Sequence, residues 1–215
     1  MGTPGGTLLV VPGRVRRARR RAALRWTGLS LVALGATLLA YVGYQLWGTG
    51  IATARAQAGF RAEIRAHGFP PRPIPGGAIG FIRIPRISLD VAFVQGTSRA
   101  DLAKGPGHYP RTPLPGESGN VVIAGHRTTH LAPFWAIDAL QPGDEIILQT
   151  RQGTFLYRVK WKRILSPEAS WVAAATTRPS LTLTTCNPRF SARERLVIRA
   201  MQASSQLIAP RLPPG

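Results

Sequence analysis

The 215-residue chain has one cysteine, four histidines and nine acidic residues, and each shortage excludes a class of protein. A single cysteine excludes a framework of internal disulfides and any cysteine-rich zinc or iron–sulfur site. The few histidines and acids leave little material for a metal centre, and no cofactor is expected. The acids face 28 lysines and arginines, which gives a net charge of +19.

Charge is missing altogether from one stretch near the amino terminus. Residues 26–54 contain no Asp, Glu, Lys or Arg, and residues 26–47 are apolar enough to form a transmembrane helix. As a helix these 22 residues span about 33 Å, enough for a hydrocarbon core of roughly 30 Å. Aromatic residues suited to the membrane interfaces stand near both ends: Trp26, Tyr41, Tyr44 and Trp47. Seven arginines precede the helix, so the positive-inside rule places residues 1–25 in the cytoplasm and residues 48–215 outside.

Other interpretations of this segment remain open. A cleaved signal peptide is one, because residues 52–54 (ATA) and 54–56 (ARA) pass as cleavage sites, although its apolar core usually has only about 7–15 residues. A buried helix of a soluble protein is another, which the flanking arginines disfavour. The arginines also resemble a nucleic-acid patch, but beside an apolar span we expect them to contact anionic lipid headgroups and no nucleic acid.

The rest of the chain is predicted to be one β-rich domain behind a stalk. Residues 48–69 suit a loose or helical stalk, and residues 70–77 (PPRPIPGG) break regular structure, so that 48–75 serves as the linker. Alternating apolar runs predict strands near 79–89, 91–95, 119–125, 144–150, 153–164, 180–186 and 194–202. Helical turns are expected near 98–104, 133–140 and 166–175. The pattern favours a small barrel or sandwich over residues 76–203 and a disordered tail, 204–215.

The one cysteine stands at the end of a predicted strand. Outside the membrane an unpaired thiol is open to oxidation, so Cys186 calls for a functional role, although free cysteine is also commonly a buried small hydrophobe. Leu181 and Leu183 share one face of the strand, and Thr182, Thr184 and Cys186 share the other. If the leucines face the core, the sulfur faces away from it. An accessible side chain on a rigid strand end suits a nucleophile.

A thiol nucleophile needs a base and a group that stabilises an oxyanion. The chain offers four histidines as bases: His67, His108, His126 and His130. His126 follows the apolar run 121–125, which places its imidazole at a strand end as well. Arginine suits the oxyanion, and three arginines share one face of the last predicted strand: Arg193, Arg195 and Arg199. Periodicity alone does not choose among them.

Several motifs in order resemble the sortase family. Residues 182–186 (TLTTC), with Arg195 nine positions later, resemble the sortase TLxTC…R signature. Residues 124–130 (AGHRTTH) resemble the sortase AGHR block, and residues 105–110 (GPGHYP) resemble the loop before it. The resemblance covers residues 78–202. The HRTT block and the YP loop are most similar to the class E branch.

The resemblance implies an all-β fold: a closed eight-stranded β-barrel with short helices, here preceded by one transmembrane helix. It implies a membrane-anchored extracytoplasmic cysteine transpeptidase with Cys186 as nucleophile, His126 as general acid/base and Arg195 as oxyanion and substrate clamp. Such an enzyme cleaves an LAxTG- or LPxTG-like sorting motif of a secreted protein between Thr and Gly. The resulting thioester passes its acyl group to an amine of the peptidoglycan precursor, which anchors surface proteins to the cell wall.

The resemblance also indicates residues that bind the sorting motif. Class E sortases are associated with LAxTG-type motifs, and a tyrosine at the position of Tyr109 is linked to that preference. Segment 164–180 corresponds to the loop that lines the substrate, and Trp171 lies within it. Thr184 and Thr185 precede the nucleophile, and Thr185 is a candidate for orienting the acyl oxygen through its hydroxyl or backbone.

Three other functions remain as alternatives. A pilin-polymerising sortase would use a lysine amine as acceptor. A non-enzymatic, membrane-tethered barrel would bind anionic wall polymers through its positive surface. Without the seven arginines before residue 26, the net charge of +19 falls to +12. An L,D-transpeptidase carries its histidine just before the cysteine, whereas 60 positions separate His126 from Cys186.

Overall fold

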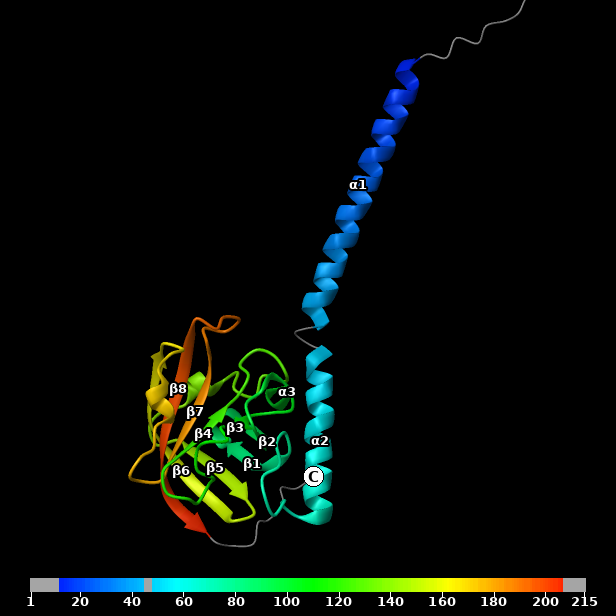
Figure 1. Cartoon of the computed structure of the whole chain (residues 1–215). Coiled ribbons are helices and arrows are strands. Elements are labelled where there is room, and N and C mark those ends of the chain that lie inside the picture. The colour runs from blue at the N-terminus through cyan, green and yellow to red at the C-terminus, as the bar shows by residue number, and fades with distance from the viewer. Residues whose placement is uncertain (1–11, 45–47, 207–215) are drawn as a thin grey trace, which may run out of the picture. The chain divides into compact units, whose positions relative to one another are not determined.

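The computed structural model describes residues 12–44 and 48–206, and the chain divides into two compact units, Met1–Tyr44 and Gln45–Gly215. The described residues of the first unit form helix α1 (Pro12–Gly43), shown in Figure 1. Its segment Arg19–Gly43 is long and apolar enough to cross a membrane, and none of it is buried. The expected apolar helix is therefore present. Residues 1–11 of the expected arm and Trp47 of the expected aromatic belt lie outside the described residues.

The second unit is built on a closed barrel of eight strands, which confirms the predicted fold class. Around the barrel the strands follow the order β1-β2-β3-β4-β7-β8-β6-β5. The pairs β2/β3 and β4/β7 are parallel, and the other pairs are antiparallel. The strands are β1 (Ala78–Ile84), β2 (Leu89–Gln95), β3 (Gly107–His108), β4 (Asn120–Ala124), β5 (Glu145–Thr150), β6 (Gly153–Leu165), β7 (Ser180–Asn187) and β8 (Glu194–Gln206).

The barrel differs from the prediction in three places. The short strand β3 lies in the GPGHYP loop, where no strand was predicted. The 3-10 helix η2 (Pro85–Ile87) ends the first predicted strand early. Strand β8 includes residues 204–206, which the sequence assigned to a disordered tail, because they continue the pairing with β6; the rest of that tail lies outside the described residues. Three other short helices fall within predicted turns: α3 (Arg99–Leu102), η3 (Ile137–Ala139) and η4 (Ser170–Ala173).

Alternate side chains of the strands fill the barrel. Leu148, Tyr157, Leu181 and Leu183 are completely buried in one apolar cluster. Each such side chain contributes about 1.5–3 kcal/mol when it leaves water. Because both leucines of β7 face this cluster, Cys186 lies on the opposite face of the strand, as the alternation predicted.

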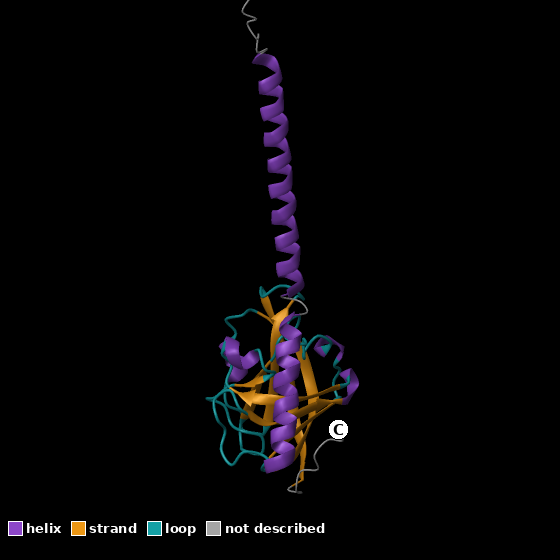
Figure 2. Cartoon of the chain, turned by 90° about the vertical axis from the view of Figure 1, so that its right-hand side faces the viewer, coloured by secondary structure: helices purple, strands orange, loops and turns teal. Residues whose placement is uncertain are grey.

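Helix α2 (Thr49–His67) packs along the barrel, where the sequence predicted a stalk (Figure 2). Gln57 donates from Nε2 to the carbonyls of Ala92 (3.0 Å) and Lys104 (2.8 Å), and its Oε1 accepts from the Ala92 N–H at 2.8 Å. Thr53 donates to the carbonyl of Ala103 at 2.7 Å. The helix thus belongs to the same compact unit as the barrel.

Replacing Gln57 tests this packing. Gln57→Ala leaves the buried N–H and C=O of Ala92 without their side-chain partner, so we expect a loss of about 1–3 kcal/mol in unfolding free energy. Urea denaturation of residues 48–206 measures it. Arg55→Ala, at an exposed position of the same helix, is the matched control, and an equal loss in both variants would contradict the packing.

Candidate active site

The pairing of three neighbouring strands brings the predicted catalytic residues together. β4 and β7 run parallel in a register that pairs Ala124 with Thr184. His126 follows Ala124 by two residues, just past the end of β4, as Cys186 follows Thr184 by two residues on β7. On the other side of β7, Cys186 pairs with Arg195 of β8. The three residues therefore stand at the ends of three adjacent strands, at one end of the barrel that we call the active-site rim.

Close packing at Gly125 sets where the chain leaves β4. The Gly125 N–H donates to the carbonyl of Thr184 at 3.1 Å, and its carbonyl accepts from the Thr185 hydroxyl at 2.7 Å. A Cβ at this position would lie 2.5 Å from the ring of Phe134, so only glycine fits. This fixed exit from the strand directs His126 to the rim.

The environment of His126 favours a neutral imidazole. Burial, and secondarily the neighbouring His130, lower the pKa of His126 from 6.5 to about 4. The two rings stack with centroids 4.7 Å apart and planes at 19°. The Nε2 atom of His126 is buried and has no hydrogen-bond partner among the described residues. Near pH 7, His126 is therefore neutral and has a ring nitrogen available for proton transfer.

The loop after His126 is strained and rests on α2. His130, Leu131 and Ala132 have φ angles of 55°, 61° and 44°, a left-handed backbone that costs free energy in residues other than glycine. The His130 N–H donates to the hydroxyl of Thr49 at 3.4 Å. A Cβ at Gly50 would lie 3.2 Å from the Leu131 side chain. The first turn of α2 thus supports the loop that carries His130.

A charged cluster fixes the ends of β4 and β7 to each other. Arg127 is 5% exposed, and its Nη1 donates to the carbonyl of Cys186 at 3.3 Å and to Oδ1 of Asn187 at 2.5 Å. Its Nη2 pairs with Asp138 at 3.1 Å, and Arg189 pairs with the same carboxylate at 3.0 Å. The sequence analysis did not identify a role for Arg127 or for Asp138. Arg127 stands inside the AGHR block, but nothing around Asp138 indicates its role.

A cavity of about 270 Å³ adjoins the rim. Tyr109, Thr184 and Arg195 line it, together with residues of segment 165–173. Arg195 donates from Nη1 to the carbonyls of Ala192 (3.0 Å) and Glu194 (3.1 Å). The cavity is open to a peptide on the same face of β7 that carries Cys186.

Two of the predicted substrate-binding residues lie apart from this cavity. The Thr185 side chain points to Gly125, away from the face of Thr184. Trp171 is 49% exposed and is not among the lining residues; its ring centroid lies 6.3 Å from that of Trp161.

The wall of the cavity is held by a polar network that sequence reasoning also missed. Asn120 of β4 donates from Nδ2 to the carbonyls of Val172 (2.9 Å) and Ala174 (3.1 Å). Its Oδ1 accepts from the Thr182 hydroxyl at 2.7 Å, and Arg199 donates to Val172 at 3.0 Å. An asparagine at the start of an otherwise apolar strand is the signal that indicates this role.

Comparison with known proteins identifies the family. The sortase domain model matches residues 82–203, more than half of the chain, and the chain therefore belongs to the sortase family. Within that family it is most like class E. It is 32% identical to sortase SrtE1 of Streptomyces coelicolor over 213 residues, 84% of this chain. It is 36% identical to sortase D of Bacillus subtilis over 118 residues, 54% of this chain. The chain spans 60% and 58%, respectively, of the length of these two relatives.

Solved structures agree with the family. Sortase E from Streptomyces avermitilis superposes with a TM-score of 0.57 at 30% identity, over 62% of this chain and 92% of that one. The SrtF sortase from Corynebacterium diphtheriae superposes with a TM-score of 0.60 at 29% identity, over 64% of this chain and 90% of that one.

The stacked histidines generate a titration experiment. His130→Gln removes a neighbouring group that lowers the pKa of His126, so we expect that pKa to rise above about 4 while staying below 6.5, because burial persists. NMR titration of the imidazole signals measures the change. His67→Gln, at the exposed end of α2, should leave the pKa of His126 where it is. An unchanged value in His130→Gln would contradict the coupling.

The charged cluster generates a stability experiment. Arg127→Met removes the donor to part-buried oxygen atoms of Cys186 and Asn187 and the ion pair with Asp138, and we expect a loss of about 1–3 kcal/mol in unfolding free energy. Arg158→Met is the matched control, because its partner Glu145 and Arg158 itself are 41% and 53% exposed and such pairs contribute at most about 1 kcal/mol. Urea denaturation compares the two. Equal losses would mean that Arg127 does not fix the strand ends.

Proposed function

We propose that the chain is a membrane-anchored, extracytoplasmic cysteine transpeptidase that joins secreted proteins to the cell wall. The single observation that supports it most is that His126, Cys186 and Arg195 stand at the ends of three adjacent strands, beside a cavity that Arg195 lines. In the proposed cycle Cys186 attacks the carbonyl carbon between Thr and Gly of an LAxTG- or LPxTG-like motif. A thioester forms, the Gly amine leaves, and an acceptor amine then takes the acyl group and releases the thiol.

His126 moves the proton through this cycle. Its neutral imidazole accepts the thiol proton as sulfur attacks, and the imidazolium then donates that proton to the leaving Gly amine. In the second half, the imidazole takes a proton from the acceptor amine and returns one to the departing sulfur. The low pKa of His126, caused mainly by burial, keeps the resting imidazole free of a proton near pH 7.

Arg195 supplies positive charge where the oxyanion forms. It is the strand partner of Cys186 and lines the cavity, and its contacts with Ala192 and Glu194 hold the guanidinium at the rim. A cation aimed at developing negative charge stabilises a tetrahedral intermediate. The Thr185 hydroxyl donates to the carbonyl of Gly125. We therefore assign the orientation of the acyl oxygen to the backbone of Thr185.

The cavity is proposed to hold the sorting motif. Tyr109 and Thr184 line it, which supports their assignment to motif binding, and Tyr109 is the residue linked to motif preference by the class E resemblance. Trp171, on the outer side of the η4 wall, is assigned to the more distant part of the substrate. The acceptor is an amine of a peptidoglycan precursor, which makes the protein a wall-anchoring enzyme with no cofactor.

The anchor and the orientation are part of the proposal. α1 crosses the cytoplasmic membrane once, with the arginine-rich arm in the cytoplasm and the barrel outside.

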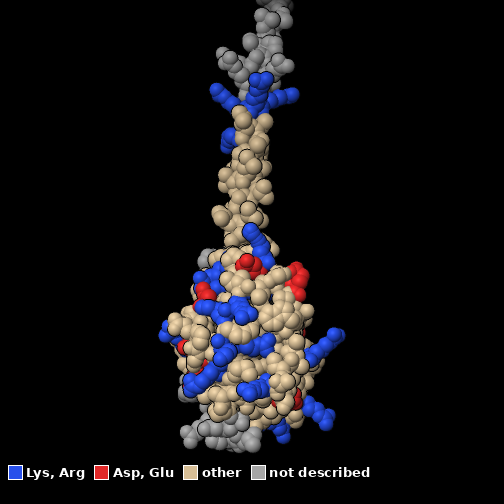
Figure 3. Space-filling view, turned by 90° about the vertical axis from the view of Figure 1, so that its left-hand side faces the viewer, with Lys and Arg blue, Asp and Glu red and all other residues tan. Residues whose placement is uncertain are grey.

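One observation favours a second function, wall-polymer binding. Lys and Arg crowd the face that carries β6 and β8 (Figure 3), and four of them on β6 are exposed: Arg158, Lys160, Lys162 and Arg163. Such a surface is compatible with catalysis, since it would hold the enzyme near anionic wall material.

Substitution of the three aligned residues tests the proposal. We expect Cys186→Ala to abolish cleavage of quenched LAxTG and LPxTG peptides, and His126→Ala and Arg195→Ala to lower it by about 10²–10⁴ and 10²–10³. The readouts are peptide cleavage and ligation to a diaminopimelate-type amine. His67→Ala and Arg193→Ala are matched controls that should keep activity.

Each outcome decides between functions. The faster of the two peptides identifies the preferred motif. Full activity in Cys186→Ala would overturn the mechanism. An inactive parent that is well folded would instead favour the wall-polymer function, to be followed by measuring its affinity for those polymers.

A further inference from the structure

Exposed apolar side chains gather at the active-site rim. Leu131, Trp135 and Phe190 are 56%, 43% and 71% exposed, and we call them the rim cluster. The rings of Trp135 and Phe190 meet edge to face with centroids 6.0 Å apart. Leu131 packs against the first turn of α2 at Gly50. Large apolar side chains that are exposed in the same region mark an interaction surface.

Two arginines lie beside the aromatic rings of the rim cluster. Arg189 stacks over the Trp135 ring at 4.5 Å, and Arg193 is exposed in the same turn between β7 and β8. Of the nearby acids, Asp138 is already paired with Arg189, and Glu194 accepts from the Asn187 side chain. Aromatic rings beside arginines suit a surface that meets apolar chains and anionic headgroups together.

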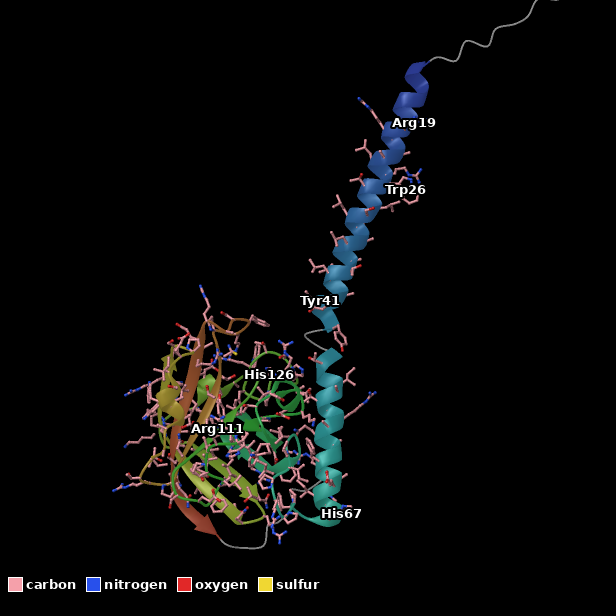
Figure 4. The ribbon with its side chains drawn as sticks, in the orientation of Figure 1. Arg19, Trp26, Tyr41, His67, Arg111 and His126 are labelled. Atoms are coloured by element: carbon pink, nitrogen blue, oxygen red, sulfur yellow. The ribbon has the colours of Figure 1, made fainter. Side chains whose placement is uncertain are left out.

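Few residues connect the two units of the chain. Five residue steps join Tyr44 to Thr49, and at roughly 3.6 Å per step they span at most about 18 Å. The rim lies at the start of α2, because the His130 N–H donates to Thr49. Figure 4 places His126 toward this end of the barrel unit and His67 at the far end of α2.

We propose that the rim cluster docks on the outer surface of the membrane that α1 crosses, so that the active-site entrance faces the lipid headgroups. This inference rests on the proposed function of α1 as an anchor. The occupant of the surface is the bilayer interface: the tether holds the rim close to it, and the aromatic and arginine side chains match its chemistry. A docked rim admits substrates that arrive along the membrane surface.

Spin labels on the full chain test the docking. In a Cys186→Ser background, Ala192→Cys carries a label beside Phe190, and Ile74→Cys carries one at a 62% exposed site outside the rim. The protein is reconstituted in vesicles of phosphatidylcholine and phosphatidylglycerol. We expect the label at 192 to be several-fold less accessible to a water-soluble nickel complex than the label at 74.

Removing the apolar side chains should reverse this protection. Trp135→Asn with Phe190→Asn removes the two paired rings of the rim cluster, and asparagine tolerates the left-handed φ of 65° at position 190. We expect the nickel accessibility of the label at 192 to rise to that of the label at 74. Ile74→Asn is the matched control and should leave the label at 192 protected. With Cys186 intact, the double variant should still cleave a soluble peptide, which shows that the barrel is folded.

The outcomes separate the docking from the anchor. If alkaline carbonate strips the parent from vesicles, the anchor is wrong and the docking fails with it. If the parent stays in the vesicles but the labels at 192 and 74 are equally accessible, the anchor stands and the docking is wrong. Protection of residue 192 that survives the double variant would overturn the role of the rim cluster.

Discussion

The active site depends on the parallel pairing of β4 with β7. The two strands lie 60 positions apart in sequence, so no local turn brings them together, and β5 and β6 form within the connection. A slip of one residue would turn His126 to the other face from Cys186. Side-chain bonds close this register at both ends: Thr182 to Asn120 at the start, and Thr185 to Gly125 at the finish.

Around this pairing, charged contacts fix the strand ends, while two buried nitrogen atoms lack a hydrogen-bond partner among the described residues. A buried guanidinium costs free energy unless it is paired, and Arg127 is paired with Asp138 and with oxygens of Cys186 and Asn187. Its Nε, like Nε2 of His126, has no hydrogen-bond partner among the described residues. The paired guanidinium nitrogens hold the strand ends in place, and Nε2 of His126 is the atom for which we propose proton transfer.

The parts of the structure that follow from burial were predictable from the sequence, and the parts that follow from distant polar contacts were not. Alternation identified the long strands and the outward face of Cys186, because it records which side chains leave water. Helix α2 was read as a stalk, since polar Thr53 and Gln57 make much of its buried face. The strand at 107–108 is too short to alternate, and Asp138 reaches the site through η3, which no local pattern records.

Helix α2 supports the loop that follows His126, although it precedes the barrel in sequence. The left-handed turn at residues 130–132 would relax if nothing held it, and the contacts that hold it come from Thr49 and Gly50. His130, which stacks on His126 and lowers its pKa, is carried by this turn. A domain boundary drawn at residues 70–77 would remove that support while leaving every barrel strand intact. The functional unit therefore begins at α2, because the strain beside His126 is offset there.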